Sequence, residues 1–330
     1  MSSNNEEVTP LYTSLAIVVP CHNEEATVEA FYEATSAIAN NDLKQMSITV
    51  RYIFIDDGSS DSTLIKLRKL SAAHSDVSYV SFSRNFGKEA ALYAGIKSAS
   101  KTEGLCAVMD VDLQDPPELL PQMVEKILSK KCDRVAAYRV SRDGEPPIRS
   151  WFAHRFYGLM NRLTNLNLRD GARDFSVMTP RFVTAVLSCG EYNRFTKGLF
   201  GWVGYPTEWV SYTNVERIAG ETNWSFWSLL RYAFDGIVAY STKPLEVLSL
   251  IGGGLSFIAI IALAFVVIRA LLFGDPVAGW PSLMAILLLV GGILTLGLGI
   301  LGYYLSKIYL EVKKRPVFLI KETSEDDWIK

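Results

Sequence analysis

Two uncharged apolar stretches near the C-terminus set the strongest limit on how this chain can fold. Residues 247–268 and 276–306 contain no Asp, Glu, Lys or Arg. Each is longer than the roughly 20 apolar residues that a helix needs to cross the ~30 Å hydrocarbon core of a bilayer. We therefore expect a transmembrane hairpin, with helices at residues 247–271 and 281–305, rather than a buried hairpin of a soluble protein.

The hydropathy change near Leu245 divides the 330 residues into regions of different character. We expect an α/β domain over residues 1–222 and two transmembrane helices within residues 246–306. Between them, residues 223–245 mix aromatic side chains with few charges, which favours an amphipathic helix lying at the membrane interface. A buried helix of the globular domain is the alternative for this segment. Residues 307–330 form the tail, and its first part, residues 307–321, is expected to return to the first domain as a short amphipathic extension.

Basic residues predict the orientation in the membrane. Lys243 precedes the first apolar stretch, and four basic residues follow the second: Lys307, Lys313, Lys314 and Arg315. The connecting loop carries Asp275 and no basic residue. The positive-inside rule then places both termini and the main domain in the cytoplasm, in a multi-pass protein of the cytoplasmic membrane. The polar, acidic N-terminus lacks the features of a cleavable signal peptide.

Composition excludes other classes of protein. The net charge of −2 and the lack of a Lys/Arg-rich tract argue against a nucleic-acid partner. The four cysteines are scattered without a metal-binding spacing, which favours reduced structural thiols: Cys21, Cys106, Cys132 and Cys189.

Short apolar runs alternate with helical patterns over the first 140 residues. The runs cover residues 15–19, 50–55, 77–82 and 105–109, and the helical patterns between them cover residues 24–39, 62–73 and 88–98. This alternation predicts βαβ units and a mostly parallel sheet covered on both faces. In such sheets, ligands bind beyond the carboxyl ends of the strands. From residue 139 to 220 the pattern breaks into loops and amphipathic pieces.

Asp110 and Asp112 follow the fourth apolar run and are the sharpest local signal for chemistry. On an extended segment, residues two apart point to the same side. Two neighbouring carboxylates favour a bound cation, and Mg²⁺ or Mn²⁺ prefers such oxygen ligands. Gln114 could add a neutral oxygen. A cation here could neutralise a diphosphate leaving group.

Asp56 and Asp57 follow the second apolar run. A carboxylate at this place can accept hydrogen bonds from a base or a ribose hydroxyl, although turn formation and helix capping explain the neighbouring Ser60 and Asp61. The chain has no glycine-rich dinucleotide fingerprint and no P-loop motif, which weakens both of those interpretations.

Four motifs in order give the chain a resemblance to a known family. They are IVVPCHNEE (17–25), IDDGSSD (55–61), RNFGK (84–88) and MDVDLQDPP (109–117), and the tail EVKKRPVF (311–318) extends the match. The chain resembles family 2 glycosyltransferases of the GT-A fold. Among these it is similar to the polyisoprenyl-phosphate glycosyltransferases, which include dolichol-phosphate mannose synthases and bactoprenol glucosyltransferases.

The resemblance implies roles for particular residues. The UDP-sugar would be bound by Pro20, His22, Glu24, Asp56, Asp57, Lys88 and Asp110. The metal and diphosphate would be bound by Asp110, Asp112 and Gln114. Arg139 and Arg149 fall where the family places basic residues for the acceptor's phosphate.

Other assignments leave alternatives open. Asp174 is a candidate for binding sugar hydroxyls or orienting an arginine, with a structural ion pair to Arg173 or Arg181 as the alternative. Lys88 could instead be a solvated lysine. The chain has Asn223 where the family tends to have a lysine, and Arg217 could replace that contact. Weaker candidates for a sugar or lipid channel, with a surface loop as the alternative, are Arg194, Lys197 and Trp202.

The resemblance also implies the reaction. A hexose, glucose in the first place, would move from a UDP-sugar to undecaprenyl phosphate in one inverting displacement assisted by Mg²⁺ or Mn²⁺. Because the acceptor phosphate has a second pKa of about 6, it already carries an anionic nucleophile and needs no strong general base. Homo-oligomers, tetramers among them, are expected. The alternatives are another UDP-sugar such as UDP-N-acetylglucosamine, a processive polysaccharide synthase, or a non-catalytic, membrane-anchored protein that binds nucleotide sugars.

Overall fold

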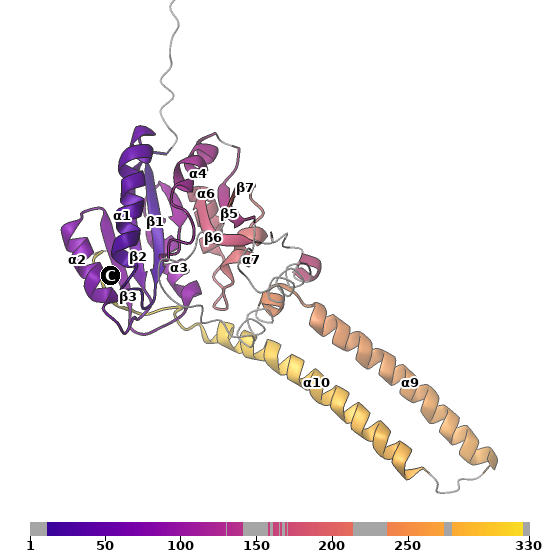
Figure 1. The fold of residues 1–330 in the computed structure, drawn as a ribbon. Helices are drawn as coiled ribbons and strands as arrows, with labels where there is room; N and C mark the ends of the chain where they lie inside the picture. The colour runs from indigo at the N-terminus through magenta and orange to yellow at the C-terminus, as the bar shows by residue number, and fades with distance from the viewer. Residues whose placement is uncertain are drawn as a thin grey trace, which may run out of the picture. The chain divides into compact units, whose positions relative to one another are not determined.

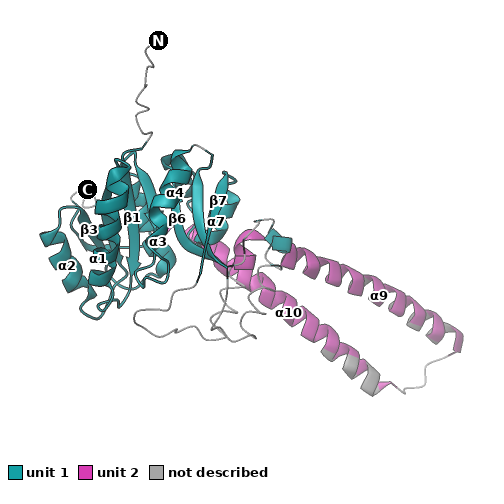
Figure 2. Ribbon diagram, turned by 45° about the horizontal axis from the view of Figure 1, so that its top comes forward, with its two compact units in different colours: residues 1–230, 316–330 teal, residues 231–315 magenta. Residues whose placement is uncertain are grey.

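The computed structural model describes residues 12–129, 131–140, 158, 161–164, 166, 169, 171–213, 236–273 and 279–325. The chain forms two compact units, which Figure 2 shows in different colours. The first comprises residues 1–230 and 316–330, and the second comprises residues 231–315.

An eight-stranded sheet forms the first unit (Figure 1). The strands are β1 (Ser14–Cys21), β2 (Thr49–Asp56), β3 (Val77–Phe82), β4 (Leu105–Val108), β5 (Arg134–Arg139), β6 (Ala172–Met178), β7 (Thr207–Tyr212) and β8 (Ile320–Thr323). Their order across the sheet is β7-β5-β6-β4-β1-β2-β3-β8. Strands β1 to β4 match the four predicted runs and pair in parallel, so the predicted mostly parallel α/β architecture is confirmed.

Helices cover both faces of this sheet. They are α1 (Val28–Ile38), α2 (Thr63–Ala73), α3 (Lys88–Ala99), α4 (Leu119–Leu128), α6 (Pro180–Ser188) and α7 (Thr196–Trp202), and a π-helical turn η1 (Ala39–Leu43) follows α1. Side chains of α1, α2 and α4 pack with one face of the strands, and those of α3, α6 and α7 with the other. Each face has a hydrophobic cluster: in β1, for example, Ile17 and Val19 belong to the first cluster, on the face of α1, α2 and α4, and Val18 belongs to the second, on the opposite face. Burial on both faces explains why the strand is apolar without alternation.

The second half of the sheet differs from the sequence prediction. Within residues 139–220, where loops and amphipathic pieces were expected, the structure has the helices α6 and α7 and two strands that were not predicted, β6 and β7. Strand β6 runs antiparallel between β4 and β5. Only its last four residues, 175–178, are buried, and they follow a charged pair, Arg173 and Asp174. So short an apolar run cannot be separated from a loop or a helix end by periodicity.

The C-terminal tail returns to the first unit, as expected, and adds a strand to the sheet. Strand β8 pairs antiparallel with the outer edge of β3, and Val80 lies opposite Thr323. The side chains of Val317, Phe318 and Ile320 pack against the second hydrophobic cluster. An exposed strand edge is a site for unwanted pairing, and β8 covers the edge of β3.

The second unit contains two long apolar helices, α9 (Lys243–Phe273) and α10 (Trp280–Lys313). Within them, residues 243–262 and 289–313 have mean hydropathies of 2.1 and 1.7, and both segments are long and apolar enough to cross a membrane. The Tyr304 hydroxyl donates to the carbonyl oxygen of Ser241 at 2.6 Å, and Gly297 lies against Leu248. Large apolar side chains such as Leu250, Phe265 and Leu298 are exposed, which suits contact with lipid. Most of the predicted interfacial helix, residues 223–235, lies outside the described residues.

Candidate active site

The predicted site residues that follow β1, β2 and β4 lie at one edge of the sheet because of the strand directions. Strands β1, β2, β3 and β4 are parallel, so their carboxyl ends lie along the same edge. Strand β6 is antiparallel to β4, and its amino end therefore lies at that edge as well. Since Val108 pairs with Ser176, continuing the register by two residues brings Asp110 beside Asp174.

Lys88 joins these two aspartates. It is the first residue of α3, and its Nζ lies 2.7 Å from Oδ1 of Asp110 and 2.5 Å from Oδ2 of Asp174. Burial opposes the charged form, but the two carboxylates outweigh it and raise the pKa of Lys88. About half of its side chain, 46%, stays exposed. Lys88 is thus an ion-paired cation at the strand ends that also keeps contact with solvent.

Asp174 contacts a second lysine. Nζ of Lys197, in α7, lies 3.7 Å from Oδ1 of Asp174. Burial would raise the pKa of Asp174, but Lys197 and Lys88 lower it below its ordinary value. The alternative of an ion pair with Arg173 or Arg181 is wrong, because these arginines pair with Asp115 and Asp133. Asp110, Lys88, Asp174 and Lys197 therefore form a row of alternating charges, which we call the charge row.

Asp110 and Asp112 do not share an extended segment. Strand β4 ends at Val108, a turn includes Asp112, and Leu113 has a positive φ of 55°. Oδ1 of Asp112 accepts a hydrogen bond from the backbone N–H of Gln114 at 3.2 Å. The expected same-side geometry along a strand is therefore wrong, although both carboxylates lie at the same strand end and are partly exposed.

The donor set fits a hard divalent cation. Asp110 already attracts one positive charge, the ammonium of Lys88. Within the described ranges, no three His, Cys, Asp or Glu side chains gather in a group that could hold a metal ion. Mg²⁺ in nucleotide-dependent enzymes commonly takes one or two carboxylates and completes its shell with phosphate oxygens and water. Asp110 and Asp112 match that pattern. The amide oxygen of Gln114 accepts a hydrogen bond from Arg173 at 3.2 Å, which a metal would have to replace.

Asp57 and His22 connect three neighbouring loops, which are the loops that follow β1, β2 and β3. Oδ1 and Oδ2 of Asp57 accept hydrogen bonds from the backbone N–H groups of Phe86 and Gly87 at 2.6 and 2.9 Å. Burial raises the pKa of Asp57, and these two N–H groups oppose the rise. Nδ1 of His22 donates to the Asp57 carbonyl at 2.9 Å, which leaves Nε2 to accept from the Asn85 amide at 3.1 Å.

The loop after β2 is packed too closely to admit a side chain at Gly58. This residue has a φ of +63°, and a Cβ added there would lie 2.3 Å from the carbonyl carbon of Arg84. Asp56 stabilises the same loop, since its Oδ1 accepts from the N–H of Ser59 and its Oδ2 from the hydroxyl of Ser81.

Two further predicted residues lie at the end of β1. Pro20 is in the strand and pairs with Ile55. The backbone N–H of Glu24 donates to Oγ1 of Thr63 at 2.8 Å, and its carboxylate accepts from the hydroxyl of Thr27, the residue before α1. The structure therefore brings together the predicted residues of β1, β2, β4 and α3, with Asp174 of β6.

Sequence reasoning missed a group that supports the loop after β4. The carboxylate of Asp115 is fully buried, and its Oδ1 accepts from Nε of Arg173 at 3.0 Å and from the Tyr212 hydroxyl. Burial raises the pKa of Asp115, and Arg173 opposes the rise. Asp115 belongs to a motif that we singled out, but no local pattern links it to partners 58 and 97 residues away.

The remaining candidates differ in where the structure places them. Arg139 is the last residue of β5, at the same edge of the sheet, and its backbone N–H donates to the carbonyl oxygen of Gly171. Arg194 is buried, and its guanidinium donates to the backbone carbonyls of Cys189 and Val186, which indicates a packing role. Trp202 ends α7 with 64% of its surface exposed. Arg149 and Arg217 lie outside the described residues.

Comparisons with known proteins identify the family of the chain. A model of glycosyl transferase family 2 matches residues 16–184. The Escherichia coli (strain K12) prophage bactoprenol glucosyl transferase homolog is 37% identical over 311 residues, which cover 94% of this chain and 99% of that protein. The SfII prophage-derived bactoprenol glucosyl transferase of Shigella flexneri is 37% identical over 309 residues, with 94% and 98% covered.

One solved structure is less similar to this chain than these sequence relatives are. Mannosyltransferase PcManGT from Pyrobaculum calidifontis, in complex with GDP-Man and Mn²⁺, has a TM-score of 0.47 and is 16% identical, covering 93% of this chain and 89% of that one. The family assignment depends on the sequence relatives and not on this likeness.

Proposed function

The chain belongs to glycosyl transferase family 2, and from that premise we propose that it transfers a hexose from a UDP-sugar to undecaprenyl phosphate. Glucose is the proposed sugar. One observation carries the proposal: the match to the bactoprenol glucosyl transferases covers 94% of the chain, which includes the apolar helices as well as the sheet. An enzyme anchored by apolar helices suits an acceptor that itself lies in the membrane.

The charge row contains two ammonium groups and two carboxylates and is neutral overall, so the positive charge that this transfer needs would come from its lysines together with the divalent cation. Donor and acceptor both carry phosphate, so their approach requires positive charge at the strand ends. Lys88 and Lys197 provide two ammonium groups, and Asp174 holds both in place. Donors and charges that are fixed before the reaction need little reorganisation as charge develops, which is a main source of catalysis.

The bond changes require no proton transfer. A phosphate oxygen of the acceptor attacks the anomeric carbon of the sugar while the bond from that carbon to the β-phosphate oxygen of UDP breaks. The configuration inverts, so an α-linked donor gives a β-linked lipid phosphate. A divalent cation bound to Asp110 and Asp112 would neutralise the departing diphosphate. We assign Arg139 and Arg149 to the acceptor phosphate.

For the nucleotide, we propose the loops that Asp57 and His22 connect. Asp56 and Asp57 shape these loops, with Pro20 and Glu24 at the neighbouring strand end. Gln114 borders the diphosphate. Lys197, Trp202, Arg194 and Arg217 remain weaker candidates for the sugar or lipid channel.

Location and assembly complete the proposal. We propose a multi-pass protein of the bacterial cytoplasmic membrane that forms homo-oligomers, with the enzymatic domain (residues 1–222), the tail (residues 307–330) and both termini in the cytoplasm. Modification of Asp275→Cys by a membrane-impermeant thiol reagent in intact cells would support this orientation. Modification of that residue only after lysis would contradict it.

The reaction can be tested by transfer of radiolabelled sugar to undecaprenyl phosphate in detergent. A panel of UDP-glucose, UDP-galactose and UDP-N-acetylglucosamine is offered with and without EDTA. We expect labelled lipid from UDP-glucose, loss of labelling with EDTA, and loss in the Asp110→Asn/Asp112→Asn double variant. Asp42→Asn, an exposed aspartate in η1, is the matched control.

Each other outcome has a definite meaning. Labelling from a different donor would replace glucose as the sugar. Labelling that persists in EDTA would remove the metal from the proposal. No labelling from any donor by folded protein that binds UDP would favour the non-catalytic nucleotide-sugar binder.

A further inference from the structure

The C-terminal tail contacts the loop between β3 and α3, residues 83–87. The ring of Phe318 stacks on Phe82, the last residue of β3, with centroids 4.8 Å apart and planes at 15°. It also meets the ring of Tyr93 in α3 edge-on, at 6.2 Å. The backbone N–H of Ser83 donates to the carbonyl of Leu319 at 2.9 Å. Phe318 therefore lies between the strand that enters the loop and the helix that leaves it.

That loop carries groups of the candidate nucleotide pocket. Its N–H groups at Phe86 and Gly87 bind Asp57, and the amide of Asn85 binds His22. The ring of Phe86 meets Phe82 edge-on at 5.8 Å. Phe318, Phe82 and Phe86 thus form a continuous row of rings from the tail to the loop.

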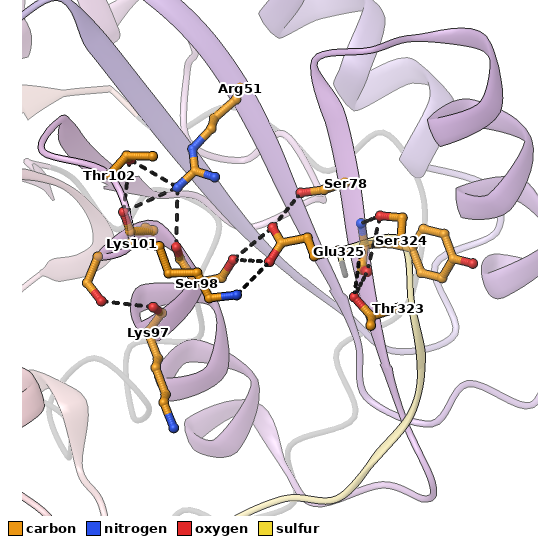
Figure 3. Close-up of polar contacts among 12 residues, drawn as sticks. Arg51, Ser78, Lys97, Ser98, Lys101, Thr102, Thr323, Ser324 and Glu325 are labelled. Carbon is orange, nitrogen blue, oxygen red and sulfur yellow. Dashed lines mark hydrogen bonds and ion pairs between the residues drawn. The ribbon is translucent and has the colours of Figure 1, made fainter. Parts of the chain in front are cut away.

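Polar contacts fix the part of the tail that follows Phe318. Two nitrogens of Arg68 donate to the Glu322 carboxylate at 2.7 and 2.6 Å. Further along, Glu325 accepts from Ser78 of β3 and Ser98 of α3, and Lys101 lies 3.5 Å from it (Figure 3). The tail therefore contacts β3 near both of its ends, at Phe82 and Ser78. It contacts α3 at its middle and near its carboxyl end, at Tyr93 and Ser98. These two elements hold the loop.

We propose that Phe318 is a positioning residue for the donor: it holds residues 83–87 in the conformation that binds the UDP part of the sugar nucleotide. This inference rests on the proposed function, which assigns the pocket to that nucleotide. The tail would then be part of the donor site and not only the link that follows a membrane helix. A change at Phe318 should therefore alter the binding of one substrate and leave the other unaffected.

The test is binding of UDP to the full-length protein in detergent by isothermal titration calorimetry, together with separate KM values for the donor and the lipid. Phe318→Leu keeps apolar bulk but removes the ring stacking, and we expect UDP to bind about three- to tenfold more weakly. The KM for the UDP-sugar should rise by a similar factor while the KM for undecaprenyl phosphate stays unchanged. Phe318→Tyr keeps the ring, so its UDP affinity and its KM for the UDP-sugar should equal those of the unaltered protein.

Two controls separate positioning from general destabilisation. Leu319→Ala changes a half-exposed neighbour in the same tail. Ile127→Ala removes buried volume from α4, which packs on the opposite face of the sheet. We expect UDP affinity to be unchanged in both, even where the melting temperature falls.

The inference is overturned if Phe318→Leu binds UDP as tightly as the unaltered protein, or if Ile127→Ala weakens binding by the same factor. If the unaltered protein binds no UDP, the proposed function itself fails, and this inference fails with it.

Discussion

The two aspartate pairs beside β1 differ in what surrounds their oxygens. Asp56 and Asp57 follow β2, and each of their four carboxylate oxygens accepts a hydrogen bond from the protein. Both residues are almost fully buried. Asp110 and Asp112 follow β4 at the same edge of the sheet, are partly exposed, and contact a lysine ammonium and one backbone N–H.

This difference shows that position at a strand end does not decide what a carboxylate does. A buried carboxylate is costly unless hydrogen bonds compensate it, and the first pair meets that condition by organising the loops around it. The second pair keeps contact with solvent and attracts cations. We infer that the first pair builds the pocket and the second acts on the ligand.

The largest effect should come from the second pair. Asp110→Asn removes the charge that pairs with Lys88 and would bind the cation, and we expect transfer activity to fall about a hundredfold or more. Stability should change by less than about 1 kcal/mol, since the ion pair is partly exposed. Activity assays and urea unfolding measure the two quantities. Retained activity would show that Asp110 does not act on the ligand, which contradicts the role inferred for the second pair.

Gly58→Ala tests the first pair's loop. The added Cβ meets the backbone of Arg84 and the positive φ disfavours any side chain, so we expect a loss of about 2–4 kcal/mol in the free energy of unfolding. Gly190→Ala is the control, because a Cβ there meets nothing within 4 Å. Equal stability of the two variants would mean that this loop can relax, which contradicts its role as a rigid support.

Asp57→Asn tests the first pair directly. It replaces a carboxylate that accepts two backbone hydrogen bonds with an amide whose nitrogen cannot accept, at an expected loss of about 1–3 kcal/mol in unfolding free energy. Asp112→Asn, measured in the same way, should lose much less. If Asp112→Asn is the more destabilising of the two, the division of roles between the pairs is reversed.

The smallest effect concerns pH and extends the comparison to Asp174. Its pKa lies below the ordinary value of 3.8, because Lys197 and Lys88 outweigh the opposing effect of burial. A carboxyl group of this kind stabilises the fold fully above its unfolded pKa and loses that contribution as the pH falls toward the folded value. The difference in unfolding free energy between the unaltered protein and Asp174→Asn should therefore shrink from pH 7 to pH 3. An increase over this range would show that Asp174 is not held by the lysines.

The sequence allowed the parallel half of the fold to be predicted but not the antiparallel half. Strands β1 to β4 are apolar runs separated by clear helical patterns, and each is found within two residues of its predicted place. Strand β6 carries the charged residues Arg173 and Asp174 near its amino end, which enters the site, so its pattern is that of a loop. The charged residues that lie at the site therefore make this strand difficult to recognise from its sequence.

For the site, individual residues could be predicted from the sequence, but the contacts between them could not. Lys88, Asp110 and Asp174 could each be singled out, since they lie in or near recognisable motifs. Their mutual contacts could not be predicted, because they depend on the insertion of β6 next to β4. The group that Arg173 and Tyr212 form around the buried carboxylate of Asp115 depends on the same insertion and was missed altogether.

The return of the tail has a consequence for the order in which the protein is made. Strand β8 is synthesised after α9 and α10, whereas the other seven strands precede both helices. At the usual rate of about 5–20 residues per second, the roughly one hundred residues between β7 and β8 take about 5–20 s to translate. During that interval the sheet lacks its edge strand, and Phe82 lacks Phe318. The nascent enzyme therefore completes the support of its loop at residues 83–87 only after both apolar helices have been synthesised.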